Sequence, residues 1–158
     1  MSRRDQIRMT EQVLAQYLAK SQTITICSVN KDGTPHPMPM WFGVEPDGAV
    51  VMTTFTKSQK IANIARDPRV SLLVESGGAV YTNLKGVVIY GKAELIRDTE
   101  RVVDILTRVS TKTLDNPDDK TRESIRNAVR GTAPKRTGIR IRPEKIVSWD
   151  HSKLGGVY

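Results

Sequence analysis

The alternation of apolar and polar residues along the chain predicts a protein built mainly from β-strands, with a few helices. Short runs rich in valine, isoleucine and threonine are separated by turns that contain glycine or proline. The runs cover residues 23–29, 49–55, 69–75, 86–96, 137–143 and 145–149, and residues 79–81 are expected to continue the sheet. Because neighbouring runs follow one another as hairpins, the pattern favours an antiparallel barrel.

One predicted strand, residues 35–44, has an unusual pattern of prolines. Residues 30–33 and 45–48 form tight turns on either side of it, and both turns end in glycine. Pro35, Pro37 and Pro39 remove every second backbone donor, which predicts an irregular strand or an edge strand. The backbone groups left free along this strand could face a ligand.

The helical segments are few, and they frame the strands of one domain, residues 1–158. We expect an N-terminal helical segment over residues 1–20, in which Thr10 opens a helix. A second helical region, residues 97–131, forms an insertion before the last strands. Because helices and strands do not alternate, the chain is not a βαβ array.

A short helix is predicted over residues 58–67, and the charged residues at its two ends have the signs that the helix dipole disfavours. Ser58 is a good N-cap and Pro68 follows as a stop signal, yet Lys57 and Lys60 lie at the end where the helix dipole favours anions. Asp67 lies at the opposite end, where the dipole favours cations. A phosphate bound by free N–H groups, the Ser58 hydroxyl and the two ammonium groups would explain this pattern. The alternative is a basic turn that is simply solvated.

The net charge of +8 is concentrated late in the chain, where residues 120–145 hold nine basic residues and two acidic ones. Such a segment attracts polyanions. Nucleic acid is not expected as a partner, because helix-turn-helix and zinc-finger spacings are missing and aromatic residues make up 5% of the chain.

The single cysteine, Cys27, excludes an intramolecular disulfide, and His36 and His151 are too far apart in sequence to predict a metal site. With no long apolar run and no signal-peptide pattern, we expect no membrane contact and a cytoplasmic location.

The sequence contains no catalytic triad, P-loop or nucleophile elbow, so an enzymatic function requires a cofactor that supplies the chemistry. Three segments could line its site: the backbone of residues 37–42 for a flat polar ring, threonine hydroxyls after the third strand, and an aromatic ring further along. The residues are Met38, Pro39, Met40 and Trp41; Thr53, Thr54 and Thr56; and Tyr81. Each also has a structural explanation, as core packing, strand propensity or a dimer contact.

Residues 52–70, which read MTTFTKSQKIANIARDPRV, resemble the phosphate-binding signature of the pyridoxamine-phosphate-oxidase-like, FMN-binding split β-barrel superfamily. Residues 32–35 and 39–42 resemble the upstream part of the same signature. The ending Ser148–Gly155 is similar to the actinobacterial branch of flavin/deazaflavin-dependent oxidoreductases of the B type. The resemblance extends over nearly the whole chain.

The resemblance implies a mainly β fold: a homodimeric, six-stranded antiparallel split β-barrel of Greek-key type, with two cofactors at the dimer interface. Ser58 and Lys60 would hold the cofactor phosphate with Lys57 nearby, and Asn63 would lie beside the phosphate or its tail. The segment Met38–Trp41 would line the ring, and Thr53, Thr54 and Thr56 would touch the ribityl chain or the ring edge. Tyr81 would reach the ring or the tail from the partner subunit, and it is the one candidate for a catalytic proton donor. The substrate-binding arginine and histidine motifs of true pyridoxamine-phosphate oxidases are missing from the end of this chain, which disfavours vitamin B6 oxidation.

Two cofactors fit this resemblance: FMN and the deazaflavin coenzyme F420, whose tail carries several carboxylates. The basic excess and the B-type resemblance favour coenzyme F420. We therefore expect an oxidoreductase that transfers hydride from the deazaflavin to a small-molecule acceptor. The alternatives are an FMN-dependent oxidoreductase of the same family, or a non-catalytic protein that binds a flavin or a tetrapyrrole.

Overall fold

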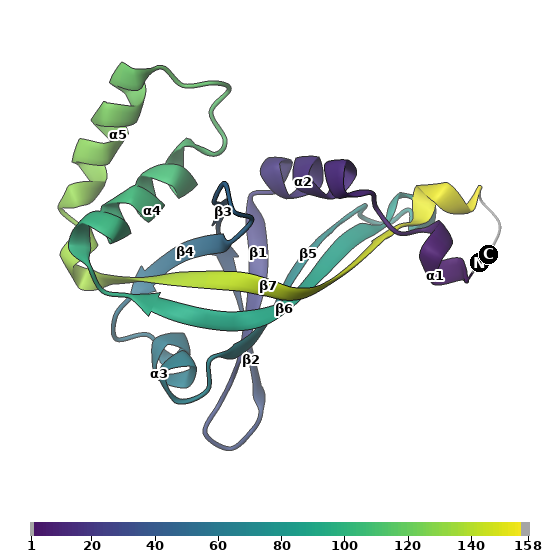
Figure 1. Ribbon diagram of the computed structural model, residues 1–158, viewed down its shortest axis with the longest axis horizontal. Helices are drawn as coiled ribbons and strands as arrows, with labels where there is room; N and C mark the ends of the chain where they lie inside the picture. The colour runs from purple at the N-terminus through teal and green to yellow at the C-terminus, as the bar shows by residue number, and fades with distance from the viewer. Residues whose placement is uncertain (1, 156–158) are drawn as a thin grey trace.

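The computed structural model describes residues 2–155 as a curled antiparallel sheet with short helices around it (Figure 1). The strands are β1 (Thr23–Val29), β2 (Pro35–Trp41), β3 (Gly43–Val44), β4 (Val50–Phe55), β5 (Arg69–Ser76), β6 (Lys85–Ile96) and β7 (Arg136–Asp150). The helices are α1 (Arg3–Gln6), α2 (Glu11–Lys20), α3 (Gln59–Arg66), α4 (Thr99–Thr111) and α5 (Asp119–Arg130), with 3-10 turns η1 (Tyr81–Asn83), η2 (Ala133–Lys135) and η3 (His151–Leu154). The prediction of a mainly β fold is confirmed.

The order of strands in the sheet is β2-β1-β5-β6-β7-β4-β3, and all the pairings are antiparallel. The proline-rich strand β2 lies at one edge, as its sequence predicts. A single residue, Phe42, connects β2 to β3, which lies at the other edge. The two edges must therefore lie close together, so the sheet curls into a half-barrel rather than extending as a flat layer.

The structure corrects three details of the predicted strands. Residues 79–81 do not continue the sheet, because Gly77 and Gly78 have positive φ angles and the chain then turns through η1. The two predicted last strands form one strand, β7, in which Pro143 is accommodated by a bulge opposite Gly91. The sheet has seven strands within the described residues, because the two-residue β3 pairs with β4.

The core fills the inside of the curled sheet. Alternate residues of β1 and β5 are buried, and they pack with residues of β4 and β7; examples are Ile24, Ile26, Leu72, Met52 and Ile139. This is the period-two burial expected of strands that are covered on one face. Figure 1 shows α2 above the curled sheet and α3 below it.

The helical insertion forms a separate layer on the opposite face of β4. Helices α4 and α5 form a hairpin (upper left in Figure 1), and their N-termini are capped by Asp98 and Asp118. Ile105 and Val109 of α4 pack on Val51 of β4. The predicted N-terminal helical segment consists of α1 and α2, and Thr10 caps α2 by accepting a hydrogen bond from the Val13 amide. None of the helices between residues 2 and 155 has the length and apolar character needed to cross a bilayer.

Candidate functional site

Helix α3 begins with a serine whose hydroxyl does not cap the helix. Ser58 occupies the N-cap position, but its side chain accepts no hydrogen bond from the first turn. Its carbonyl accepts from the Ile61 amide, while no protein acceptor within the described residues is found for the amides of Gln59 and Lys60. Two donors at the positive end of the helix dipole are therefore available to an anion.

Lys60 is the unusual residue of this region, because it is a buried cation that has no carboxylate partner among residues 2–155. Only 7% of the residue is exposed, and burial lowers the pKa of its ammonium group. Within the described residues, its ammonium group makes one hydrogen bond, from Nζ to Thr54 Oγ1, at 3.2 Å. A buried charge normally has a partner of opposite sign, so this arrangement predicts an anionic ligand.

The hydrogen bonds around Lys60 run toward the helix N-terminus. Thr54 accepts from Lys60 and donates through its own hydroxyl to Ser58 Oγ, at 3.4 Å. The hydroxyl proton of Ser58 has no acceptor in the part of the chain that the structure describes. The chain of donors therefore ends on a group that can donate to a ligand oxygen. We call Thr54, Ser58, Lys60 and the first-turn amides of α3 the α3 cradle.

Asn63 has a structural role in the same helix. Its amide nitrogen donates to Ser28 Oγ at 3.1 Å and to Asn30 Oδ1 at 2.9 Å. Its oxygen accepts from the side chains of Gln59 and Arg66. The contacts with Ser28 and Asn30 join α3 to β1 and to the turn that follows it, while those with Gln59 and Arg66 lie within α3. The four contacts fill the bonding capacity of the amide, so a position of Asn63 beside a phosphate stays a prediction.

The unfavourable charge at the other end of α3 has a local explanation. Asp67 ends the helix and binds the Arg69 guanidinium at 2.6 Å. Hydrogen bonds from the Arg69 side chain lower the pKa of Asp67 to about 2. The carboxylate is therefore compensated within the chain, whereas the ammonium of Lys60 is not.

The three predicted threonines point in different directions. Thr54 lies on the core side of β4, while Thr53 lies on the opposite face, because side chains alternate along a strand. Thr56 bonds Thr137 Oγ1 at 2.9 Å, and its amide donates to the Lys135 carbonyl at 3.1 Å. Only Thr54 therefore contributes its side chain to the α3 cradle in the described structure.

Two cations that the sequence analysis did not single out lie close to Thr56. Lys135 and Arg136 lie beside the β4–α3 junction, where Arg136 pairs with Phe55 in register and stacks 4.6 Å from the centroid of its ring. The Nε atom of Arg136 is buried without a hydrogen-bond partner. Lys57, Lys60, Lys135 and Arg136, which we call the cationic rim, form no ion pair with any described carboxylate.

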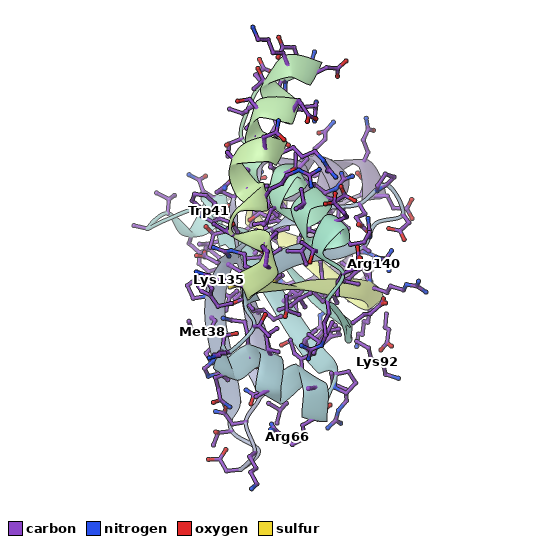
Figure 2. All side chains as sticks on the ribbon, turned by 90° about the vertical axis from the view of Figure 1, so that its left-hand side faces the viewer. Met38, Trp41, Arg66, Lys92, Lys135 and Arg140 are labelled. Atoms are coloured by element: carbon purple, nitrogen blue, oxygen red, sulfur yellow. The ribbon has the colours of Figure 1, made fainter. Side chains whose placement is uncertain are left out.

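A gap in the sheet lies beside this rim. Strand β3 pairs with β4 only at Val50 and Val51, so from Met52 onward β4 has a single neighbour, β7. The facing edge is β2, whose prolines leave carbonyl acceptors but few N–H donors along the outside. Figure 2 shows Met38 and Trp41 of β2 on the same side of the molecule as Lys135.

The predicted ring-lining residues of β2 alternate between two faces. Met38 and Met40 are opposite Ile26 and Ile24, so they share the core face, and Met40 packs against the core. Pro39 and Trp41 are on the outer face, and 62% of Trp41 is exposed. An exposed tryptophan at an open sheet edge is a suitable platform for a planar ligand or a protein partner.

Tyr81 lies away from the α3 cradle within one chain. It belongs to η1, beyond the end of β5 that is distant from α3, and its ring lies 4.6 Å from that of His151. The first and last residues of β5 are seven steps apart, which corresponds to a separation of about 23 Å at about 3.3 Å per residue. The residues quoted for the candidate site therefore do not all come together in one copy, and a contribution from Tyr81 would require a second copy.

The basic segment 120–145 is divided among different surroundings. Arg126 and Arg130 pair with Glu100 and Asp104 of α4, and Arg140 pairs with Glu45 and Asp47. These charges are compensated inside the protein, so only part of the basic excess can act on a ligand. Among the described residues, no group of three histidine, cysteine or acidic side chains could hold a metal ion.

The sequence profile of the pyridoxamine 5′-phosphate oxidase family matches residues 9–150 of this chain. None of the curated proteins matches it. Among solved structures, the conserved hypothetical protein Rv2991 from Mycobacterium tuberculosis is similar over the full chain, with 34% identity, 95% of its own length covered and a TM-score of 0.84.

Two more distant structures share the fold. One is an F420 reductase, with 21% identity and a TM-score of 0.60, for which 83% of this chain and 93% of that chain are covered. The other is an FAD-binding protein from Mesorhizobium loti, with 19% identity and a TM-score of 0.64, for which the shares are 89% and 94%. At these identities, the likeness describes the curled sheet and its order of strands.

Proposed function

We propose that this chain, which belongs to the pyridoxamine 5′-phosphate oxidase family, binds coenzyme F420 and transfers hydride to a small-molecule acceptor. The observation that supports a phosphate-bearing cofactor is the buried ammonium of Lys60, which has a hydroxyl partner and no carboxylate. A phosphate fits the α3 cradle because its charge matches Lys60, and its oxygens can accept from Ser58 and the free amides.

The deazaflavin is preferred over FMN because of the cationic rim. One phosphate is sufficient to compensate Lys60, yet Lys57, Lys135 and Arg136 also lack carboxylate partners among the described residues. A cofactor tail with several carboxylates would use these charges, whereas FMN carries only its phosphate. The similarity to an F420 reductase agrees with this choice.

The protein residues would bind and orient the cofactor rather than react with the substrate. When bound, the deazaflavin supplies the hydride. Lys60 and Ser58 would hold the phosphate, and the Met38–Trp41 edge would offer carbonyl acceptors to the N–H group of the ring. The cradle holds no aspartate, glutamate or histidine, so proton delivery would come from solvent or from Tyr81 of a second copy.

A homodimer is part of this proposal. Across the outer face of the sheet, the register aligns Thr25, Leu73, Val88 and Val147 in one row, with Tyr90 exposed nearby. A mostly apolar row on an open sheet face is typical of a protein interface. In such a dimer, Tyr81 of the second copy is the one that could reach the cofactor. Light scattering should give the mass of a dimer, and Leu73→Glu should reduce it to that of a monomer.

The test is a fluorescence titration of the cofactor-free protein with coenzyme F420, FMN and haem in separate experiments. We expect coenzyme F420 to bind at micromolar concentration or below, and FMN at least about tenfold more weakly, a difference of about 1.4 kcal/mol. Tighter FMN binding would replace the deazaflavin with FMN. Binding of haem alone, or of none of the three, would overturn the proposal.

Turnover is the second part of the test. In the presence of the protein, the reduced deazaflavin should be oxidised by an acceptor from a panel of activated double bonds, which gains the hydride and a proton. If the coenzyme binds tightly but no acceptor is reduced, the protein is a non-catalytic carrier, and the hydride-transfer part of the proposal is wrong.

A further inference from the structure

A second cationic pocket lies on the opposite face of β4, between the helical hairpin and β3. It has a volume of about 580 Å³ and is lined by residues of α2, β3, α4, α5 and the α4–α5 connection. This volume suits a small organic molecule. The α3 cradle lies on the core side of β4, whereas α4 packs on Val51 from the other side, so the two sites are separate.

The charges that line this pocket are only partly compensated. Arg101 and Arg126 have carboxylate partners in Glu45, Asp104 and Glu100. Arg108, Lys112 and Arg122 also line the pocket, and none of them pairs with a carboxylate in the described part of the chain. The only carboxylate of the lining, Asp104, is already bound by Arg101 and Arg126.

The two uncompensated arginines are held in place by backbone carbonyls. The stem of Arg108 passes over Gly43, where a Cβ atom would lie 2.9 Å from its Cγ, and its Nη1 donates to the Val44 carbonyl at 3.2 Å. Arg122 donates through Nε to the Pro117 carbonyl at 3.0 Å. Each guanidinium keeps further N–H groups available for an oxyanion.

Lys112 is the most unusual residue of the lining. Its Nζ atom is buried and has no hydrogen-bond partner. It lies 3.2 Å from the centroid of the Phe42 ring, which is completely buried in the core. Burial lowers the pKa of Lys112 to about 8. A cation–π contact provides no acceptor for the three N–H donors of the ammonium, so a ligand oxygen would complete its surroundings.

We propose that this pocket, which we call the α4–α5 pocket, binds a small organic anion through a carboxylate or phosphate group held by Lys112, Arg108 and Arg122. The body of the ligand would lie against the Val44 and Leu114 side of the lining. Binding there does not depend on the cofactor, because the residues involved are on the other face of β4.

The experiment uses the full chain with Lys60→Met, so that the α3 cradle no longer competes for anions. Isothermal titration with pyrophosphate and with citrate distinguishes a phosphate ligand from a carboxylate ligand. We expect at least one of them to bind, and adding Lys112→Met should weaken that binding about tenfold. Arg122→Gln, at an exposed position that is tolerant of substitution, should weaken it about fivefold.

The matched control is Lys120→Gln, which removes a charge from α5 at a position outside the lining and should change the affinity less than about twofold. The proposal is overturned if the Lys60→Met protein binds neither anion at millimolar concentration. It is also overturned if Lys112→Met and Arg122→Gln together leave the affinity unchanged. Cofactor titrations of Lys112→Met and Arg122→Gln in the chain that retains Lys60 report on the α3 cradle separately, so the failure of one site is distinguishable from failure of the other.

Discussion

Arg140 and Lys60 are cations buried to nearly the same degree, with exposed fractions of 9% and 7%, but they differ in their charged partners. Arg140 binds Glu45 at 2.7 Å and also pairs with Asp47, so its charge is compensated within the chain. In the described part of the chain, the ammonium group of Lys60 has only a threonine hydroxyl as its hydrogen-bond partner. Burial of a cation alone therefore does not predict a binding site in this protein, whereas burial without a carboxylate partner does.

The largest expected effect is on the compensated side of this comparison. Glu45→Gln leaves Arg140 with the exposed Asp47 only, so we expect the free energy of unfolding to fall by about 3 kcal/mol. Urea denaturation measures the loss. Glu123→Gln on α5, which removes an exposed carboxylate without an ion pair, is the control. A loss below about 1 kcal/mol would show that the Arg140 cluster is as weakly coupled as a surface pair.

The opposite behaviour is expected for Lys60. Lys60→Met removes a buried charge that the cofactor-free protein leaves uncompensated, so the variant should gain about 1 kcal/mol of stability. Its affinity for a phosphate-bearing cofactor should fall by about 1.5–3 kcal/mol, since a charge-assisted contact is lost. Denaturation and titration of the same preparation measure both changes. Loss of stability together with unchanged affinity would make Lys60 a structural residue.

A smaller effect is expected at the cationic rim. Lys135→Gln combined with Arg136→Gln should weaken coenzyme F420 binding by about 1 kcal/mol and FMN binding by less, because the two charges face a tail that FMN lacks. The difference should shrink as salt is added. Lys20→Gln, at the end of α2, is the control. Equal losses for the two cofactors would argue against a tail at the rim.

The smallest effect is a pH dependence of stability caused by Lys112. The folded protein loses this proton near pH 8, while an unfolded chain keeps it to about pH 10.4. Between these values the unfolded chain holds more protons, so the contribution of Lys112 to the free energy of unfolding rises with pH. Solvent screening keeps the change below about 1 kcal/mol. Urea titrations at pH 7 and pH 9 should show a rise that Lys112→Met reduces, and an identical rise in both proteins would refute the assignment.

The local parts of this structure could be predicted from the sequence. The N-cap and stop signals bound helix α3 closely, and three alternate prolines indicated the edge position of β2. Both signals depend on residues within ten positions of one another, so they act through local backbone geometry. The fold class followed from the same kind of pattern.

The non-local parts could not be predicted. Lys135 and Arg136 reach the β4–α3 junction only through the register of β4 and β7, which joins residues about eighty positions apart. Tyr81 fits a strand pattern, but Gly77 and Gly78 redirect the chain before it. The carboxylates that compensate Arg126, Arg130 and Arg140 come from other segments, so counting charges along residues 120–145 overestimates the excess available to a ligand.

The central claim is that Lys60 binds a cofactor phosphate, and a paired titration tests it most directly. The wild-type protein and Lys60→Met are titrated with coenzyme F420 and with its deazaflavin chromophore lacking the phosphate and tail; FMN and riboflavin form a second pair. The account predicts that Lys60→Met lowers affinity for the phosphorylated member of each pair about tenfold or more and leaves the other member unchanged. An equal change for both members would contradict it, because Lys60 would then act on the ring or on the fold.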